Sequence, residues 1–462
     1  MISFSHLAHC QQIIDLKNID LSIARRFITD TRVFKEQDAL IAIPGLKVNP
    51  LNLINDLLSR GLDIIFYQHS IENEEIVLNY QKQFPHVTFV ALKDSVAFIQ
   101  ELAHLHIKGW LQNPSHTLFA ISGSNGKTTH KEMLSHIMEE ILPGQVVYTK
   151  KNNNNHLGVP LTLLDVSSLT QFVVLELGSN HPGEIKFLCD LALPNAGLTT
   201  NIGATHLEFF GTENEVFLEE GYLYYAVKEN TNGEGFYLIN NNDEYLRTLK
   251  DTSGSKRFGD DEACELMISF FEDGAKLAEL EVHNQEITGK HNKSNLVTCA
   301  YIAHHFYPEF REQILKAAAS FKPTANRSQW IEKNHSHIFL DAYNANPSSM
   351  KVALQGFRDH LQGLGLDPDQ SCVIMGDMNE LGDSSAHYHQ ETGSFVASLG
   401  FNKIVFIGRF ADDYLRGSTV GRGFSDVASF RALYQKEFLG KIPYHFIKGS
   451  RSLQLESLFD IT

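Results

Sequence analysis

The amino-acid sequence predicts an α/β protein that is divided into several domains. Short apolar runs alternate with helix-like stretches along the whole chain, which is the rhythm of α/β units. A chain of 462 residues also has room for about two to four domains, each with its own core. Polar or proline-marked breaks divide this chain into three segments, residues 1–112, 113–322 and 323–462.

The first segment carries the pattern of a small α/β domain. Its apolar runs predict strands at residues 39–43, 64–67 and 87–90. Helix-like stretches cover residues 51–60 and 94–106, and the second of them is amphipathic. The polar segment 111–115 contains a proline and marks the first domain boundary.

The second segment begins a new α/β unit. Its buried-strand candidates are residues 118–122, 172–177 and 196–200. The last two end close to polar residues, and ligands collect at such strand ends in an open parallel sheet. The polar stretch 251–261 is expected to be a loop, and residues 276–282 alternate like an antiparallel edge.

The third segment repeats the same signal after a helix and the link at Phe321–Thr324. Its predicted strands are residues 338–340, 372–375, 403–407 and 443–447, with helices between them. The chain shows no internal repeat and no low-complexity tract.

Composition excludes several classes of protein. Hydrophobic residues make up 43% and charged residues 20%, which is ordinary for a globular chain. The formal charge of -16 argues against binding to nucleic acid or to an anionic membrane. No signal peptide and no apolar run of about 18 residues is present, so we expect a soluble, cytoplasmic protein. Five widely spaced cysteines fit buried structural thiols better than disulfides or zinc: Cys10, Cys189, Cys264, Cys299 and Cys372.

The sharpest local signal is a phosphate-binding loop. An apolar strand runs into Gly123-Ser124-Asn125-Gly126-Lys127-Thr128-Thr129, and a helix-like stretch follows at residues 130–140. The glycines let backbone N–H groups face a polyphosphate, Lys127 can reach the outer phosphates, and Thr128 can ligate magnesium. The strict spacing would place glycine where Ile121 stands, so this loop is a shortened variant. The alternative is a Gly-Lys-Thr turn that arose by chance.

Two further strand ends offer metal ligands. Glu176 ends one apolar run, and His206 lies just past another. Magnesium in a phosphoryl-transfer site takes a few oxygen ligands beside the loop hydroxyl, and Glu176 suits that role. His206 suits it less well, because a lone histidine is more often a packing or loop residue.

Other polar runs allow both a functional and a structural interpretation. The asparagines at residues 152–155 are ordinary residues of a solvated turn. Asp341 follows a strand and could accept hydrogen bonds from a ribose, while Tyr343 could face a base. Equally, Asn346 could cap a helix whose first residue is Pro347.

Taken in order along the chain, these motifs resemble the Mur ligase family. The motifs are GSNGKTT, NNNNHLGVPLTLL, ELGSNHPGEI, NIGATHLEFFG, GKHNKSN, NRSQ, DAYNANPSSM and GDMNELG. The last two point to the family member that adds D-alanyl-D-alanine, and the absence of a DNPR-like motif argues against the sibling that adds a diamino acid. The likeness is strong over residues 117–393 and looser before them.

This resemblance implies three domains with distinct tasks. Residues 1–112 would bind the UDP-sugar, residues 113–322 would form a P-loop ATPase domain, and residues 323–462 would form a Rossmann-like ligase domain. ATP with Mg²⁺ would phosphorylate the terminal carboxylate of UDP-N-acetylmuramoyl-tripeptide, and the amine of D-alanyl-D-alanine would attack the acyl phosphate. The resemblance implies no nucleic-acid or membrane partner, and a monomer is expected.

The resemblance also implies roles for individual residues. Lys127, His206 and Glu220 would serve catalysis, and the metal ligands would be Thr128, Glu176, His206 and Glu220. ATP would be held by Gly123, Ser124, Asn125, Gly126, Lys127, Thr128, Thr129, Asn292, Asn295, Arg327, Asp341 and Tyr343. The substrates would be contacted by Thr31, Arg32, Gly45, Asn155, Asn344 and Asn346. Val48-Asn49-Pro50 departs from the family's pattern on the uridine side.

One departure from the family concerns the metal site. These ligases usually carry a lysine, carbamylated by carbon dioxide, fourteen residues after the family histidine, and here that position is Glu220. We hypothesise that Glu220 replaces the carbamate, because both are carboxylate-like anions. The alternative is an acid on a helix surface beside a weakly held second metal.

Two other functions remain open at this point. One is a related amide ligase with a different amino substrate. The other is a nucleotide-binding homologue that has lost catalysis and has a regulatory role, an idea motivated by the altered lysine position. An amino-acid panel would identify the first, and phosphate release that needs both substrates would exclude the second.

Overall fold

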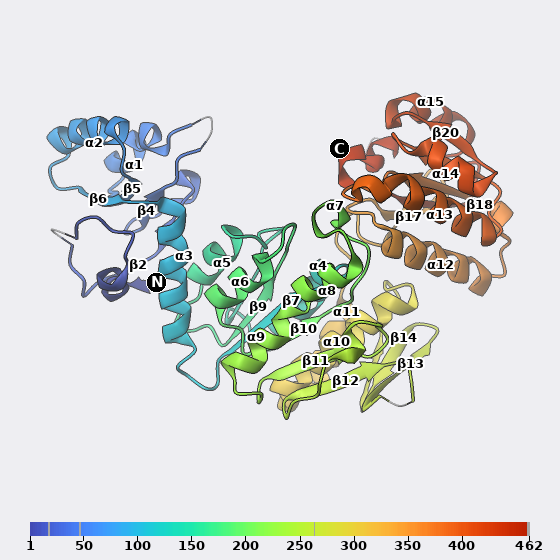
Figure 1. Ribbon diagram of the computed structural model, residues 1–462, viewed down its shortest axis with the longest axis horizontal. Helices are drawn as coiled ribbons and strands as arrows, with labels where there is room; N and C mark the ends of the chain where they lie inside the picture. Colours follow the sequence, from blue (N-terminus) through green and yellow to red (C-terminus); the bar gives the residue numbers. More distant parts are fainter. Residues whose placement is uncertain (17–18, 46–47, 263, 460–462) are drawn as a thin grey trace.

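The computed structural model describes residues 1–16, 19–45, 48–262 and 264–459. Within them the strands form one large, two smaller and one minimal sheet, and each sheet draws on a continuous stretch of the chain. We call the residues around the four-stranded, nine-stranded and six-stranded sheets the N-terminal, central and C-terminal units. Figure 1 shows them side by side in chain order. The α/β fold class predicted from the sequence is confirmed, whereas the boundaries after residues 112 and 322 stay predictions.

The N-terminal unit is a parallel sheet with the order β3-β4-β5-β6. Its elements are β3 Phe27–Ile28, β4 Ala39–Ala42, α1 Asn55–Ser59, β5 Ile64–Gln68, α2 Ile71–Gln83, β6 Thr88–Leu92 and α3 Ser95–Trp110. A separate antiparallel pair joins β1 (Ile2–Ser3) and β2 (Ala24–Arg25). The strands predicted near residues 39, 64 and 87 are all present.

Helix α3 joins the N-terminal unit to the central one. Asp94 caps it by accepting hydrogen bonds from two backbone N–H groups of its first turn. Its buried residues, such as Phe98 and Ile107, belong to one apolar cluster that contains Phe66 of β5 and Leu175 of the central sheet. Since a single core spans both units, tilting one against the other would expose apolar surface to water.

The central unit contains nine strands in the order β15-β14-β13-β12-β11-β10-β7-β9-β8. The strands are β7 Thr117–Ser122, β8 Val146–Tyr148, β9 Phe172–Glu176, β10 Ala196–Thr199, β11 Phe236–Asn240, β12 Ser255–Gly259, β13 Leu266–Phe271, β14 Gly274–Leu277 and β15 Leu280–His283. Pairing is parallel from β8 to β13 and antiparallel through β14 and β15, so the predicted antiparallel edge is present.

The loop predicted at residues 251–261 is wrong in part, because β12 occupies Ser255–Gly259. This strand is polar, with Lys256 and Arg257 in its middle, and it lacks the apolar run by which strands are recognised. It forms because β11 and β13 supply backbone partners on both sides. Arg257 donates to Asp251, 2.7 Å away, and Lys256 pairs with Glu265 at 2.6 Å.

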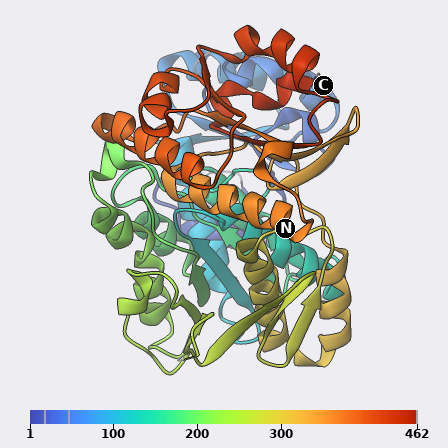
Figure 2. The ribbon, with the colours of Figure 1, turned by 90° about the vertical axis from the view of Figure 1, so that its right-hand side faces the viewer.

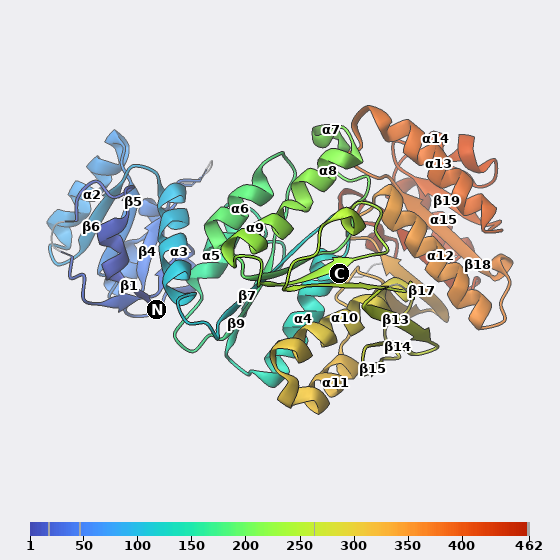
Figure 3. The ribbon, with the colours of Figure 1, turned by 60° about the horizontal axis from the view of Figure 1, so that its bottom comes forward.

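Helices cover both faces of the central sheet, as Figure 3 shows. The helices of the central unit are α4 Lys127–Ile141, α5 Gly158–Leu164, α6 Glu184–Ala192, α7 Leu207–Phe210, α8 Glu213–Glu220, α9 Tyr222–Asn230, α10 Lys290–Phe306 and α11 Arg311–Ser320. Helices α4, α10 and α11 bury their apolar residues on one face, and α5, α6 and α9 pack on the other.

The C-terminal unit is a six-stranded sheet with the order β16-β17-β21-β18-β19-β20, parallel except for the β16–β17 pair. Its elements are β16 Gln329–Lys333, β17 Ser336–Asp341, α12 Pro347–Gly363, β18 Ser371–Gly376, α13 Ser385–Ser398, β19 Ile404–Ile407, α14 Ala411–Ser418, β20 Arg422–Phe424, α15 Val427–Glu437 and β21 Tyr444–Lys448. Figure 2 shows this unit, orange to red, above the green and yellow central sheet.

Helix α7 crosses the boundary between the central and C-terminal units. Leu207 and Phe210 belong to the central unit by sequence, yet they are buried in the same apolar cluster as Met378 and Leu381. The C-terminal core is therefore completed by a helix from the central unit.

Two more findings bear on the expectations from composition. All five cysteines are buried and unpaired, as predicted. In the described part of the chain, no helix has the length and apolar character needed to span a membrane.

Candidate functional site

The loop between β7 and α4 has the geometry of a phosphate-binding loop. Gly123 and Gly126 have φ angles of 119° and 81°, which favour glycine. A Cβ on Gly123 would lie 2.2 Å from Oγ1 and 2.8 Å from the backbone nitrogen of Thr200. Any side chain at this position would therefore push the loop off the neighbouring strand end.

The loop is held in place by the segment that follows β10. Ser124 donates its backbone N–H to the carbonyl of Asn201 (2.8 Å), and Thr200 Oγ1 donates to the carbonyl of Asn125 (2.6 Å). Ser124 Oγ accepts from the backbone N–H of Gly203 at 2.9 Å. These contacts preorganise the loop, and sequence reasoning did not identify the polar groups of residues 200–203 as part of it.

Lys127 and Glu220 meet at this loop. Glu220 is the last residue of α8 and only 2% exposed. Its Oε2 accepts the backbone N–H of Gly123 at 2.8 Å, and its Oε1 lies 3.4 Å from Lys127 Nζ. Lys127 also donates to the Gly123 carbonyl. Glu220 is thus a buried anion at the phosphate loop, and the alternative of an acid on a helix surface is wrong.

Thr128 and Glu176 form a second contact beside the loop. Thr128 Oγ1 donates to Glu176 Oε1 at 2.9 Å, and Asn154 Nδ2 donates to the same oxygen at 3.0 Å. Glu176 is 2% exposed, and its Oε2 has no hydrogen-bond partner. A hydroxyl beside a buried carboxylate with an unpartnered oxygen is a donor set that suits Mg²⁺.

His206 is held from the C-terminal unit. It has a left-handed backbone with φ 53° at the start of α7, and its Nδ1 lies 2.6 Å from Glu380 Oε2. Among the described residues, no three His, Cys, Asp or Glu side chains gather into a metal centre. The structure thus places Glu176 and Glu220 at the loop but does not gather them with His206, and this ligand set stays a prediction.

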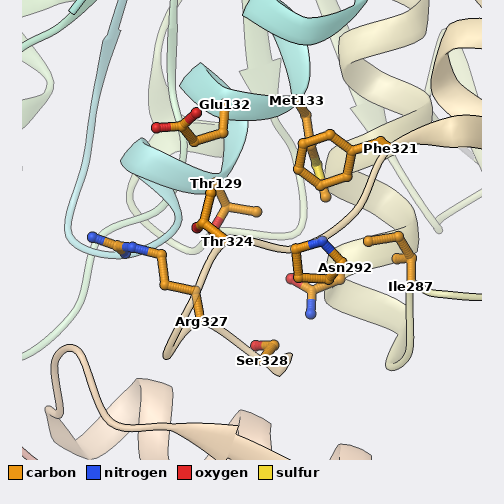
Figure 4. Close-up of a pocket in the computed structure, with 10 residues that line it drawn as sticks. Thr129, Glu132, Met133, Ile287, Asn292, Phe321, Thr324, Arg327 and Ser328 are labelled. Carbon is orange, nitrogen blue, oxygen red and sulfur yellow. The ribbon is translucent and has the colours of Figure 1, made fainter. Parts of the chain in front are cut away.

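A small cleft adjoins the first turns of α4, as Figure 4 shows. Three of the residues predicted to hold ATP line it, namely Thr129, Asn292 and Arg327. Sequence reasoning missed the other lining residues, which are Glu132, Met133, Ile287, Phe321, Pro323, Thr324 and Ser328. An apolar floor with a few polar groups is typical of a site for a small planar ligand. Asn295 instead lies at the loop, its Nδ2 3.7 Å from where a Cβ on Gly126 would stand.

The residues that follow β17 form the C-terminal side of the site. Asp341 accepts from the backbone N–H of Ser328 at 3.1 Å and from Lys448 Nζ at 2.5 Å. The guanidinium of Arg327 lies over the ring of Tyr343, 3.9 Å from its centroid. Lys448 is only 3% exposed, and no local sequence signal identified it, because its partner lies more than a hundred residues earlier.

Two of the asparagines predicted on the substrate side are engaged within the protein. Asn346 caps α12 by accepting the backbone N–H of Ser349 at 2.9 Å, which confirms the predicted helix cap. Its Nδ2 also donates to Asn125 Oδ1 of the phosphate loop at 2.5 Å, and Asn125 Nδ2 donates to Ser348 Oγ at 2.9 Å. Asn155 accepts the N–H groups of the turn that begins α5.

The remaining predicted substrate residues lie in a short 3-10 helix and in loops of the N-terminal and C-terminal units. Asn344 Oδ1 accepts the N–H of the following residue at 2.9 Å. Arg32, next to Thr31, pairs with Asp30 at 2.7 Å, and this guanidinium lowers the pKa of Asp30 to about 2. Gly45 donates its N–H to the carbonyl of Val48 at 3.2 Å.

Comparison with known proteins identifies two regions of the chain. Residues 121–303 match the profile of the Mur ligase middle domain, and residues 326–435 match that of the Mur ligase, glutamate ligase domain. Together these profiles cover more than half of the chain.

Curated relatives share about a quarter of their residues with this chain. The UDP-N-acetylmuramoyl-tripeptide--D-alanyl-D-alanine ligase of Bacillus subtilis (strain 168) is 27% identical over 93% of this chain and 91% of its own length. The protein of the same name from Escherichia coli (strain K12) is 28% identical over 77% of this chain and 79% of its own.

Solved structures show the same architecture. MurF from Acinetobacter baumannii has a TM-score of 0.80 and 25% identity, covering 99% of this chain and 97% of that one. A MurF ligase from Thermotoga maritima in complex with ADP has a TM-score of 0.73, with 95% and 96% covered. At 20% identity, this second likeness concerns the fold alone.

Proposed function

The chain belongs to the Mur ligase family, and on this premise we propose that it is an ATP-dependent ligase that joins D-alanyl-D-alanine to UDP-N-acetylmuramoyl-tripeptide. The reaction would supply a precursor of peptidoglycan and would take place in the cytoplasm. The observation that carries this proposal is the loop of residues 123–129, in which Lys127 donates to the Gly123 carbonyl, together with the Thr128–Glu176 contact beside it.

A carboxylate needs activation before an amine can attack it. Transfer of the γ-phosphoryl group of ATP to the tripeptide carboxylate gives an acyl phosphate, whose phosphate is a good leaving group. Lys127 and the loop N–H groups would meet the negative charge that develops during this transfer. The amine of the dipeptide then forms the amide bond, and phosphate leaves.

The donor set at the loop fits magnesium. Thr128 and Glu176 would hold the ion, with His206 and Glu220 as further proposed ligands. When bound, the ion neutralises charge on the phosphoryl oxygens. Glu220 would take the place of a carbamylated lysine, and its proximity to Lys127 and Gly123 supports that assignment.

The cleft beside α4 would receive the base of ATP. Asn292 and Arg327 line this cleft, Asn295 lies at the loop, and Asp341 and Tyr343 approach from the C-terminal unit. Thr31, Arg32 and Gly45 would contact the UDP-sugar from the N-terminal unit. Asn155 and Asn344 would lie toward the peptide and the dipeptide, and Asn346 would act through its contact with Asn125.

Phosphate release with purified protein tests this proposal. We expect ATP-dependent release only when UDP-N-acetylmuramoyl-tripeptide and D-alanyl-D-alanine are both present. Lys127→Ala should abolish nearly all release while circular dichroism shows a retained fold. Lys186→Ala is the matched control, because this lysine pairs with Asp190 on the surface of α6.

Other results would point elsewhere. Release with a different amino acid in a panel would indicate a related ligase with another amino substrate. Nucleotide binding without any release would indicate a homologue that has lost catalysis, and release unaffected by Lys127→Ala would refute the role of the loop.

A further inference from the structure

Helix α7 and the loop before it connect the C-terminal unit to the phosphate loop. The segment after β10 holds the phosphate loop through Thr200 and Asn201, and it continues through His206 into α7. Leu207 and Phe210 of α7 are then buried in the C-terminal core. A displacement of the C-terminal unit is therefore transmitted to His206, unless α7 is first pulled from that core.

A backbone contact fixes the same place. Glu208 donates its N–H to the carbonyl of Glu380 at 3.2 Å. A Cβ built on Gly382 would lie 3.1 Å from Glu208 Cα and 3.4 Å from Glu208 Cβ. The turn at residues 380–382 thus lies directly against the first turn of α7.

The two residues of the His206–Glu380 contact each have an unusual backbone conformation. Both residues are left-handed, with φ angles of 53° and 64°. This conformation is costly for residues with a Cβ, and it persists where the surroundings enforce it. Here it brings the imidazole and the carboxylate to 2.6 Å across the boundary between the two units.

We propose that Glu380 is a positioning residue that orients the His206 imidazole from the C-terminal unit and fixes its tautomer. The inference rests on the proposed function. Nδ1 and Glu380 Oε2 are 2.6 Å apart without the alignment of a hydrogen bond. Two lone pairs would repel each other at that distance, so the carboxylate oxygen favours the ring proton on Nδ1 and leaves the lone pair of Nε2 available to a ligand. The docked C-terminal unit therefore sets the orientation of His206, and Glu380 acts through that imidazole.

An engineered disulfide between the two units distinguishes a Glu380 that orients His206 from a Glu380 that only docks the C-terminal unit. A Cβ built on Gly382 lies 3.4 Å from Glu208 Cβ, which is close to the Cβ–Cβ distance of about 3.5–4.5 Å in disulfides, so Glu208→Cys/Gly382→Cys can be joined. The native cysteines are all buried and do not compete. We expect the bond to form on mild oxidation of the protein without ligands, as seen by mass spectrometry. Because Gly382 has a φ of 54°, Gly382→Cys alone is first checked for a retained fold by circular dichroism. Failure of the folded double variant to form the bond would overturn the proposal.

Glu380 variants are then compared with and without this disulfide. Glu380→Ala should lower kcat by about 10–100-fold, the usual effect of removing such a partner, and leave KM for the dipeptide nearly unchanged. Glu380→Gln keeps an acceptor and should recover most of the rate. With the disulfide formed, the loss of kcat in Glu380→Ala should persist, because the C-terminal unit is already held in place. Full recovery of kcat with the disulfide formed would overturn the proposal, because Glu380 would then serve only to dock the C-terminal unit.

Glu391→Ala serves as the matched control. Glu391 pairs with Lys351 at 2.6 Å within the C-terminal unit, and its loss should change neither the rate nor the formation of the disulfide.

A readout without turnover keeps this test separate from the proposed function. In protein labelled with ¹⁵N-histidine, the resonances missing from His206→Ala belong to His206. We expect the Nδ1–H tautomer in the wild type without ligands and a shift toward Nε2–H in Glu380→Ala. An Nε2–H tautomer in the wild type, or no change in the variant, would refute the proposal even if the ligase reaction were established.

Discussion

Replacing Glu220 by glutamine tests the buried anion at the phosphate loop. The change keeps the size of the side chain, and the new amide oxygen can still accept the N–H of Gly123. What is lost is the negative charge 3.4 Å from Lys127 Nζ. If Glu220 stands where relatives use a carbamylated lysine, the reaction requires this charge. It then does not require carbon dioxide.

The contacts set the magnitude of the effect. At 3.4 Å and an effective dielectric constant of about 20, the gross attraction between the two charges is about 5 kcal/mol. Desolvation of both groups offsets much of it. Lys127 also keeps its bond to the Gly123 carbonyl and is 14% exposed, so we expect a net loss of about 1–3 kcal/mol in the free energy of unfolding.

Glu219→Gln is the matched control for the neighbouring residue. Glu219 is also buried, and its carboxylate accepts from Ser179 Oγ and from the backbone N–H groups of Gly183 and Ile185 at 2.7–2.8 Å. It should destabilise the protein to a similar extent in urea without touching the phosphate loop. Only Glu220→Gln should therefore weaken nucleotide binding, measured by calorimetry, and lower phosphate release by about tenfold or more.

Two results would refute this account of Glu220. One is equal nucleotide affinity in Glu219→Gln and Glu220→Gln. The other is a wild-type enzyme that loses its activity in buffer depleted of carbon dioxide and regains it with bicarbonate, since that dependence would require a carbamate.

Three further outcomes are expected. Gly123→Ala should lower the free energy of unfolding by about 2–4 kcal/mol and abolish nucleotide binding, because φ is 119° and the new Cβ would meet Thr200; unchanged calorimetric affinity would contradict the loop geometry. Asn292→Ala should raise KM for ATP by about tenfold with KM for the dipeptide unchanged, and equal rises in both would show that the cleft does not serve the nucleotide. Burial lowers the pKa of His130 and of His445 from 6.5 to about 4. The unfolded chain therefore binds more protons between these values, and stability should fall as pH drops from about 6.5 to 4; a urea midpoint that stays constant over this range would contradict the burial of both rings.

Much of the fold could be predicted because local pattern and tertiary structure agree. The strand before the phosphate loop is an uninterrupted apolar run, as expected of a strand buried on both faces. Glu176 was identified for a related reason, since it is the last residue of such a run, and Thr128 was identified by the glycine-rich motif that follows β7. Strand β12 was missed because its residues are polar and its partners lie on neighbouring strands.

The missed site residues share one physical cause. Glu380, Ser348 and Lys448 act on partners that lie from about a hundred to more than two hundred residues away. No periodicity or spacing near these positions encodes such a meeting. Asn125 shows the same limit, because its place in the loop was evident whereas its bridge to Asn346 was not.

The interior that α3 shares with the central sheet has a consequence for substrate length. Because the two units cannot tilt freely, the span from Arg32 to Lys127 is fixed. Under the proposed function, Arg32 would contact the UDP-sugar and Lys127 the phosphate at the far end of the same substrate, so the fixed span would select for substrate length. A peptide stem one residue shorter or longer, about 3.5 Å in extended form, would bring its carboxylate short of the phosphate or past it.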